Sequence, residues 1–465
     1  MAQPQATTRG AWFPEARYGL FIHWGPYAQY GRGEQVLFRE RLDQREYAAR
    51  ACAWNPADFD ARAWARTAKR AGFRYAVLTA RHHDGFCLWD SKVTDYTSAA
   101  QAPKRDFVRE YADAFRAEGL KVGLYYSLAD WCVPAYYLGP RRDPAGWTRF
   151  RDYVHAQVEE LLTGYGPLAT FWFDGAWPRN ARAWESERLV ARMRQLQPDM
   201  LVNNRLDAND PEEGPGLGAD GKSVEAAGES RLLGDFGTPE HHITAEKGRL
   251  WESCQVTTWR LWGYAAGERW RPADLWLDML TEATAKGGNL LLNVGPDGDG
   301  RLPAPFVERA EQVGEWLRVH GECVYGPNAA DGAGPGANDV TEAVTYGRQI
   351  VKGNSLYLLF RFWPGEPTFR LAGLETRIRS ATLLTTGRTL GVVQSADEVT
   401  LSGLPPERPT PLFPVVRLDC DGPPAPRPWA RERLWSGDPL VMAEWAGTRG
   451  PSVRADGYQE GEPAR

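Results

Sequence analysis

Short apolar segments alternate with longer amphipathic segments through about the first 300 residues of the chain. The apolar segments have the length of buried strands and occupy residues 18–24, 75–79, 122–126, 169–173, 201–203 and 289–294. The segments between them carry apolar residues at helical spacing and occupy residues 59–71, 107–118, 147–163, 184–196, 272–286 and 305–319. This alternation of strands and helices predicts an α/β fold with a parallel sheet.

Residues with reactive side chains follow several of these predicted strands. His23 lies near the end of the first strand, His82 and His83 follow the second, and Arg205 follows the fifth. A (β/α) barrel carries its active site on the ends of many strands, whereas an open sheet concentrates it at one crevice. The segment GLGADGKS at residues 216–223 matches both the GxGxxG and the P-loop patterns. It lies in a Gly- and acid-rich loop rather than directly between a predicted strand and a predicted helix, which lowers the nucleotide-binding alternative. We therefore predict a TIM-like (β/α) barrel catalytic domain over residues 1–328.

The pattern changes after residue 328. Residues 328–338 are rich in Gly, Ala, Asn and Pro and predict a linker. Short strand-like runs separated by turn signals follow, at residues 355–362, 368–371, 380–385, 399–401 and 414–418. This pattern predicts an all-β sandwich domain over residues 339–421. A Pro- and Trp-rich extension, residues 422–465, completes the chain, and we expect its polar end to be disordered.

The composition of the chain limits the kinds of molecule that it is expected to bind. The net charge is −5 and the Arg residues are scattered, so no basic stripe indicates nucleic acid or an anionic membrane. No run approaches the roughly 18 apolar residues of a membrane span. The first residues lack the charged and apolar regions of a signal peptide, so we expect a cytoplasmic enzyme. The chain also has 20 Trp, 18 Tyr and 17 Phe, and although most must serve the core, aromatic faces also stack on sugar rings.

One carboxylate is placed at the end of a predicted strand. Asp174 closes the run Phe171-Trp172-Phe173-Asp174-Gly175, where a barrel would present a nucleophile, a base or a metal ligand. The alternative is a turn that begins with Asp-Gly. Trp172 lies two residues earlier and therefore on the same face of the strand as Asp174.

Three of the seven histidines lie at strand ends, and two roles compete for them. His23, His82, His83 and Asp84 could bind a divalent metal, but adjacent histidines seldom converge on one ion without a further spaced ligand. Hydrogen bonding to sugar hydroxyls suits imidazole, Tyr, Trp and Arg, and we favour it. The six cysteines are spread singly, which is typical of reduced thiols rather than of a zinc site or a disulfide scaffold.

Seven segments together resemble a known family. They are WFPEARYGLFIHWGPYA, GFRYAVLTARHHDGFCLWDS, KVGLYYSLADW, FWFDGAWP, GDFGTPE, WESCQVTTWRLWGY and GGNLLLNVGPDGDGRLP. In this order they resemble the α-L-fucosidases of glycoside hydrolase family 29, over about residues 12–327. The resemblance implies an irregular (β/α) barrel followed by a β-sandwich domain, and an exo-acting enzyme that removes terminal α-L-fucosyl residues from fucosylated glycans without a cofactor.

The resemblance also implies roles for individual residues. The family uses a retaining mechanism with a covalent glycosyl-enzyme, and Asp174 matches its nucleophile. Trp172 would pack beside the sugar. The positions that match those holding fucose hydroxyls are His23, Glu34, His82, His83, Tyr125 and Arg205. In many relatives a Trp follows the residue that Glu34 matches, but here Gln35 stands there, so aromatic residues of neighbouring loops would have to supply a stacking platform.

The acid/base has two candidates. Glu240, in the segment GDFGTPE, matches the family position best, and Glu252, in WESC, is the rival. The acidic residues Glu212, Glu213 and Glu225 lie in a loop that we expect to be solvated. The leaving group would contact loops 29–42, 132–148 and 207–231, whose sequences select no single linkage. Two other classes remain as alternatives: a catalytically limited fucose-binding protein and a metal-dependent hydrolase.

Overall fold

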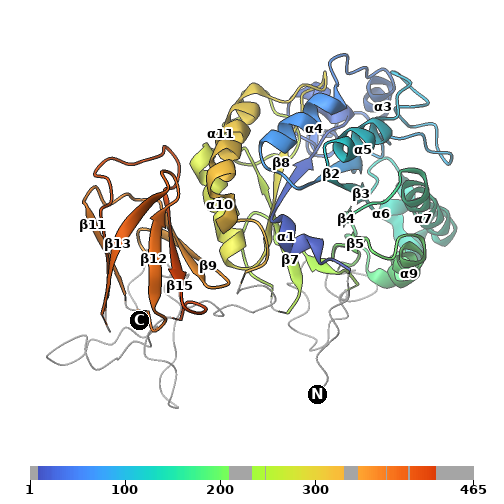
Figure 1. The fold of residues 1–465 in the computed structure, drawn as a ribbon. Coiled ribbons are helices and arrows are strands. Elements are labelled where there is room, and N and C mark those ends of the chain that lie inside the picture. The colour runs from blue at the N-terminus through green and yellow to red at the C-terminus, as the bar shows by residue number, and fades with distance from the viewer. Residues whose placement is uncertain are drawn as a thin grey trace, which may run out of the picture.

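The computed structural model describes residues 9–208, 233–246, 248–328, 344–372, 374–395 and 398–425. They form a barrel domain with a smaller β-domain beside it (Figure 1). Most of the linker predicted at residues 328–338, most of the loop at 207–231 and most of the extension at 422–465 lie outside the described residues. Glu212, Glu213 and Glu225 lie outside them as well.

Within these ranges, the barrel sheet has eight parallel strands in the order β5-β4-β3-β2-β1-β8-β7-β6. The strands are β1 (Tyr18–Ile22), β2 (Tyr75–Arg81), β3 (Lys121–Ser127), β4 (Thr170–Asp174), β5 (Leu201–Val202), β6 (Phe236–Gly237), β7 (Leu250–Val256) and β8 (Asn289–Val294). A parallel bridge between Asn203 and Phe236 joins the two edge strands and closes the barrel. The TIM-like barrel and six of its predicted strands are confirmed.

Two strands, β6 and β7, were not predicted from the apolar pattern. β6 has only two residues, too few to form a recognisable run. β7 contains Glu252, Ser253 and Gln255, and all three are buried. Buried polar residues on both faces of a strand break the apolar pattern that indicates a strand.

Helices cover the outside of the barrel (Figure 1). They are α1 (Trp12–Ala16), α2 (Val36–Arg39), α3 (Gln44–Cys52), α4 (Ala61–Arg70), α5 (Phe107–Ala117), α6 (Pro134–Arg142), α7 (Pro144–Gly164), α8 (Ala181–Trp184), α9 (Ser186–Leu196), α10 (Ala273–Ala285) and α11 (Ala304–His320), with short 3₁₀ turns η1 (Pro26–Tyr30) and η2 (Gly321–Cys323). The six predicted helices correspond to α4, α5, α7, α9, α10 and α11. Side-chain caps fix several starts: Asp60 accepts two backbone N–H bonds at α4, and Asp106 accepts one at α5.

Strand periodicity divides the core into two layers. Alternate residues such as Phe21, Tyr125 and Trp172 form one cluster inside the barrel, and their neighbours pack outward against the helices. Phe13 of α1 joins the inner cluster beside Phe236. Asp174 has the same parity as Trp172, so the strand that buries the tryptophan also directs this carboxylate to the barrel axis.

The second domain is antiparallel and all-β, as predicted. Its strands are β9 (Gly347–Lys352), β10 (Ser355–Phe360), β11 (Thr368–Ala372), β12 (Ile378–Leu383), β13 (Arg388–Gln394), β14 (Glu398–Ser402) and β15 (Val415–Cys420). They form one sheet in the order β11-β14-β13-β12-β15-β10-β9. β13 pairs with β12 through its first half and with β14 through its second half, so the sheet bends there and encloses a sandwich-like core.

Helices α10 and α11 face the second domain (Figure 1). Trp316 of α11 donates its indole N–H to the carbonyl of Phe413 over 2.7 Å. Arg348 of β9 pairs with Asp278 and Glu282 of α10 at 3.1 and 3.4 Å. Apolar residues of both domains share one core cluster, so the β-domain packs against the barrel through the helices α10 and α11.

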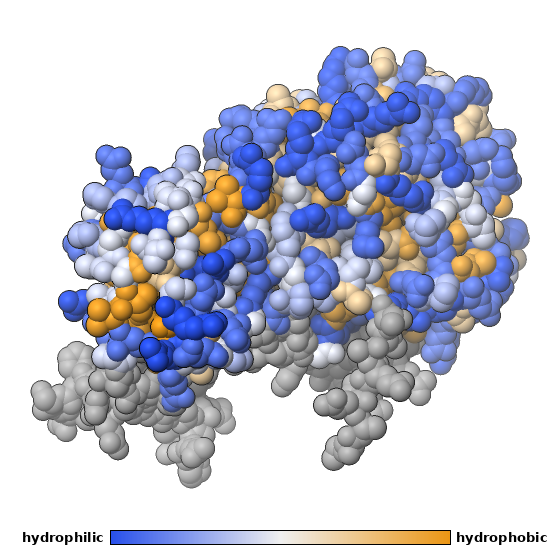
Figure 2. Space-filling view, viewed as in Figure 1, coloured by the Kyte–Doolittle hydropathy of each residue, from blue (hydrophilic) through white to orange (hydrophobic). Residues whose placement is uncertain are grey.

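Charged and polar residues cover most of the face shown in Figure 2, and apolar residues appear there in small separate patches. Among the helices that the structure describes, none combines the length and apolar character that crossing a membrane requires. All six cysteines are free, as predicted.

Asp235, which directly precedes β6, helps to close the barrel by bonding to β5. Its carboxylate accepts the backbone N–H of Val202 over 2.7 Å and pairs with Arg194, and its own N–H donates to the Val202 carbonyl over 2.7 Å.

We expect Asp235→Ala to lower the free energy of unfolding by about 1–3 kcal/mol, because the substitution leaves the partly buried N–H of Val202 without its acceptor and Arg194 without its carboxylate. Urea unfolding measures this. Asp199→Ala, an exposed position nearby, is the matched control and should change little; equal losses would contradict the role of Asp235.

Candidate active site

Asp174 is held at the end of β4 by an extension of the sheet. The side chain of Asn203 accepts the N–H of Phe173 and donates to the Phe173 carbonyl, each over 2.8 Å. Gly175 then turns the chain with φ +71°, and a Cβ there would lie 2.8 Å from Ala129. Since only glycine tolerates both conditions, the Asp-Gly pair is required by the turn and places the carboxylate at the same time.

Three side chains surround the Asp174 carboxylate, which is 14% exposed. Tyr125 donates its hydroxyl to Oδ2 over 2.9 Å, and Arg205 Nη1 lies 3.3 Å from Oδ1. His83 Nε2 lies 3.8 Å from Oδ2. The tyrosine and the arginine orient the carboxylate and supply the positive charge that a buried anion needs.

Arg205 also contacts a second carboxylate. Its Nη2 lies 2.7 Å from Glu240 Oε2, and its guanidinium lies 4.8 Å over the Trp172 ring. Thr238 fixes the guanidinium by accepting bonds of 3.0 and 3.1 Å from Nε and Nη2. Although burial opposes it, the charges of Glu240 and Asp174 raise the pKa of Arg205. One cation therefore bridges the two carboxylates.

Glu240 follows β6 and forms a parallel bridge with Cys254 of β7. The N–H of Cys254 donates to the carbonyl of Pro239 over 3.0 Å, so β6 is in effect prolonged to reach the cavity. The Glu240 side chain is 34% exposed, more than twice the fraction of Asp174. Glu240 thus stands at the mouth of the site, whereas Asp174 lies deeper.

His23 and His83 are neutral and present an acceptor nitrogen to the cavity. Burial lowers the pKa of His23 to about 3 and that of His83 to about 4. His83 Nδ1 lies 2.6 Å from the Ser127 hydroxyl, which itself donates to the Ala129 carbonyl, so Nδ1 carries the proton. His23 Nδ1 donates to Asn293 Oδ1 over 2.6 Å. In both rings Nε2 remains as an acceptor for a hydroxyl.

His82 and Glu34 complete the polar wall. Burial lowers the pKa of His82 well below its ordinary value, and within the described part of the chain its Nδ1 is buried without a hydrogen-bond partner. Glu34 accepts the N–H groups of Gly263 and Trp262 over 2.8 and 3.1 Å. Burial raises the pKa of Glu34. Its carboxylate ties the loop after β1 to the loop after β7.

These side chains line one cavity of about 140 Å³ at the carboxyl ends of the strands. The structure places nine predicted residues around it: His23, Glu34, His82, His83, Tyr125, Trp172, Asp174, Arg205 and Glu240. It adds five that the sequence analysis did not single out: Phe21, Gln35 as a wall residue, Trp177, Cys254 and Trp262. Trp177 and Trp262 stand in the segments FWFDGAWP and WRLWGY, so aromatic residues just after strand ends were the available signal.

Glu252 does not line this cavity. Its carboxyl group is fully buried inside the barrel, where it accepts the Tyr75 hydroxyl over 2.5 Å and the Trp172 indole N–H over 2.8 Å. Burial raises its pKa to about 7. Glu252 therefore supports Trp172 on the side away from the cavity, and the tryptophan ring separates Glu252 from the cavity.

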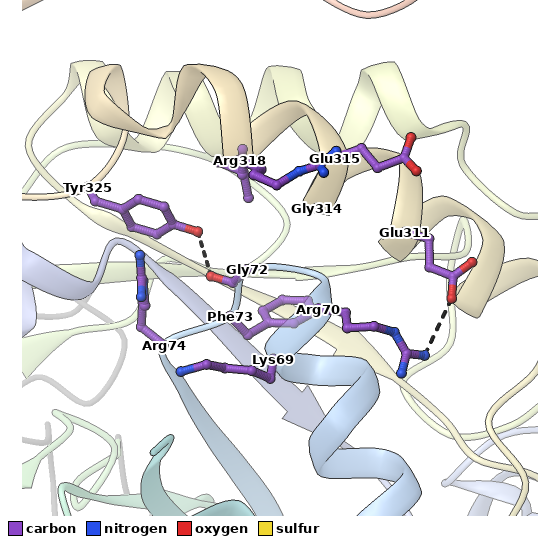
Figure 3. A pocket seen from close by; sticks show the side chains of 11 residues that line it. Lys69, Arg70, Gly72, Phe73, Arg74, Glu311, Gly314, Glu315, Arg318 and Tyr325 are labelled. Carbon is purple, nitrogen blue, oxygen red and sulfur yellow. Dashed lines mark hydrogen bonds and ion pairs between the residues drawn. The ribbon is translucent and has the colours of Figure 1, made fainter. Parts of the chain in front are cut away.

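Within the described ranges, no three His, Cys, Asp or Glu side chains are grouped so as to hold a metal ion. A larger hollow of about 580 Å³ lies between α4 and α11 (Figure 3). There Arg70 pairs with Glu311 at 3.4 Å, and Tyr325 donates to the Gly72 carbonyl over 2.6 Å. Arg74, which lines it, precedes β2, so the hollow adjoins the amino-terminal ends of the strands. That end of a barrel serves stability rather than catalysis.

A barrel with two carboxylates beside a small cavity of histidines and aromatic rings is the arrangement expected of a glycoside hydrolase. The α-L-fucosidase family model matches residues 2–322, and the chain belongs to that family. α-L-Fucosidase isoenzyme 1 from Paenibacillus thiaminolyticus is 35% identical with a TM-score of 0.76, covering 89% of this chain and 99% of its own.

A second solved relative is a family 29 α-L-fucosidase from Bacteroides thetaiotaomicron, captured as a covalent intermediate with 2-fluoro-fucosyl fluoride in a glutamate-to-glutamine variant. It is 28% identical with a TM-score of 0.76, covering 88% of this chain and 94% of its own. The tissue α-L-fucosidase of Bos taurus is 30% identical over 68% of each chain. The family resemblance seen in the sequence is confirmed.

The buried histidines predict an acid-sensitive fold. The unfolded chain takes up a proton on His83 below about pH 6.5, whereas the folded ring stays neutral to about pH 4, so stability is lost as the pH falls through this window. We expect the free energy of unfolding of the wild type to fall relative to that of His83→Gln by on the order of 2–3 kcal/mol between pH 7 and pH 4. Urea unfolding at several pH values measures the difference. A difference that does not vary with pH would contradict the neutral buried ring.

Proposed function

We propose that this protein is a retaining exo-α-L-fucosidase that hydrolyses terminal α-L-fucosyl residues of fucosylated glycans. One observation carries the proposal: Asp174 and Glu240 approach the same Arg205 guanidinium, at 3.3 and 2.7 Å, beside the sugar-sized cavity. Retaining glycosidases use two carboxyl groups about 5–5.5 Å apart. The shared contact with Arg205 brings Asp174 and Glu240 to the same part of the cavity, which supports a role for them as such a pair.

The depth and size of the cavity support exo action. Its volume of about 140 Å³ is well below the several hundred Å³ of pockets that take drug-sized ligands. It has room for one terminal sugar residue. His23 and His83 would accept hydrogen bonds from the sugar hydroxyls, and Trp172 and Trp262 would pack on the apolar parts of the ring.

In the first step, an Asp174 oxygen would form a bond to the anomeric carbon while the bond from that carbon to the leaving oxygen breaks. Glu240 would give its proton to the leaving oxygen. In the second step, Glu240 would take a proton from water, which attacks the same carbon and releases Asp174. The covalent intermediate of the Bacteroides relative supports this two-step course.

The position of Glu252 favours Glu240 as the acid/base. A general acid must come within hydrogen-bond reach of the leaving oxygen, and Glu240 lines the cavity mouth. Glu252 has the raised pKa of a general acid, about 7, but both of its oxygens are used by Tyr75 and Trp172 beneath the cavity. Geometry takes priority over pKa in this assignment.

We expect wild-type protein to release 4-nitrophenol from 4-nitrophenyl α-L-fucoside at a rate that chelator does not change. Asp174→Ala should lose roughly a thousandfold or more in kcat, because no other group can form the covalent bond. Asp199→Ala is the control on folding and handling. Activity that chelator abolishes would favour the metal-dependent alternative, and tight fucose binding without turnover would favour the binding-protein alternative.

Azide distinguishes the two acid/base candidates. In Glu240→Ala the aryl leaving group departs without help, but water attack on the intermediate lacks its base, so azide should restore turnover and give α-L-fucosyl azide with retention of configuration. Product analysis by NMR measures the configuration. In Glu252→Ala we expect lower activity without azide rescue, since the change acts through the support of Trp172. Rescue of Glu252→Ala alone would reverse the assignment.

A further inference from the structure

A second hollow adjoins the candidate active site on its outer side. This aromatic groove has a volume of about 500 Å³ and is lined by residues of α2, the start of α3, α6 and the loops beside them, including Phe38, Arg39, Arg41, Gln44, Trp131 and Tyr137. Phe38 and Tyr137 are 54% and 46% exposed. Large aromatic side chains this open to water serve no core, and clustered exposed apolar groups mark interaction sites.

Trp131 connects the groove to the sugar cavity. Its ring lies 4.9 Å from the ring of His83, which lines the cavity, and stacks at 5.1 Å on Phe38, which lines the groove. Its backbone N–H donates to the His83 carbonyl over 2.8 Å. Gln44 and Tyr137 both donate to the Trp131 carbonyl, over 2.9 and 3.3 Å. Trp131 therefore stands between the two hollows, since it lines the groove and contacts a residue that lines the cavity.

The cavity mouth and the groove share two further elements. Gln35 lines the cavity and precedes α2, whose Phe38 and Arg39 line the groove; Gln35 Oε1 accepts the Arg39 Nε–H over 2.7 Å. Trp177, which is 48% exposed at the mouth, is tied to α6 because Tyr136 donates its hydroxyl to the Trp177 carbonyl. An arc of aromatic rings thus leads from the mouth into the groove.

The chemistry of the groove fits a neutral oligosaccharide. The exposed faces of Phe38 and Tyr137 match the C–H faces of pyranose rings. The guanidinium groups of Arg39 and Arg41 and the amide of Gln44 can donate to hydroxyls. We propose that the aromatic groove binds the sugar residues on the leaving-group side of the scissile bond, an inference that rests on the proposed function. The enzyme would then prefer fucosylated oligosaccharides in which at least two further residues follow the fucosyl group.

The test compares an aryl substrate, which cannot fill the groove, with oligosaccharides, which can. Phe38→Ala, Tyr137→Ala and the double variant are assayed on 4-nitrophenyl α-L-fucoside and on α1,2-, α1,3-, α1,4- and α1,6-fucosylated tri- and tetrasaccharides. For the oligosaccharide that the wild type cleaves with the highest kcat/KM, each variant should lose about two- to tenfold. Aryl fucoside cleavage should stay within about twofold, which also shows that the variants fold. Phe38→Tyr should keep full activity on both substrates.

Phe362→Ala is the matched control, since Phe362 is a 64% exposed phenylalanine of the β-domain. Equal effects of Phe38→Ala on both substrates would overturn the groove proposal. So would cleavage of the aryl fucoside by a wild type that cleaves none of the oligosaccharides, and the α-L-fucosidase chemistry of the proposed function would then still stand without its glycan substrates. A change of oligomeric state in Phe38→Ala, measured by light scattering, without a selective loss on oligosaccharides would show instead that the groove is a contact between copies of the chain. Absence of any fucoside cleavage by the wild type would overturn the proposed function itself.

Discussion

The closure of the barrel between β5 and β6 is the constraint on which the site depends. Both strands have two residues, so side chains complete the pairing: Asn203 extends the sheet toward β4, and Asp235 bonds to Val202. The reactive groups lie beside this seam. Asp174 follows the clamp that Asn203 makes, Arg205 lies two residues after Asn203, and Glu240 follows β6. The irregular pairing therefore brings the two carboxylates and their shared cation together at one place.

Burial of polar groups gives the site its chemical character. The histidines of the wall are neutral because desolvation outweighs the nearby carboxylates, so they act as hydrogen-bond acceptors rather than as further cations. Arg205 is thus the main positive charge between Asp174 and Glu240. Deeper in the barrel, the two carboxyl oxygens of Glu252 accept hydrogen bonds from Tyr75 and Trp172. The same residue type performs different tasks at different depths, because access to the cavity decides which carboxyl group can take part in the reaction.

The sequence alone predicted the barrel, six of its strands, the all-β domain and nine of the cavity residues. The strands and the residues at their ends could be predicted because apolar periodicity and strand-end chemistry are local signals. Glu34 and Glu240 were predicted only through the resemblance to the family. β7 was not predicted because it contains several buried polar residues. The depth of Glu252 could not be predicted either, since only packing shows that its carboxyl group is buried against Tyr75 and Trp172. Trp177 and Trp262 were missed as wall residues because an aromatic residue after a strand is as common in a core as at a binding site.

Gln35 shows how a local departure from the family pattern is absorbed by the surrounding structure. Where many relatives carry a tryptophan, this chain has an amide that lines the cavity and holds Arg39. The aromatic surface of the cavity comes instead from Trp172, Trp177 and Trp262, which belong to two other strand–loop units. With no indole at position 35, α2 leads from the cavity directly to Phe38 and to the groove beyond Trp131. Recognition of the terminal sugar thus depends on the strand ends, whereas the loops after β1 and β3 are free to vary what lies on the other side of the bond.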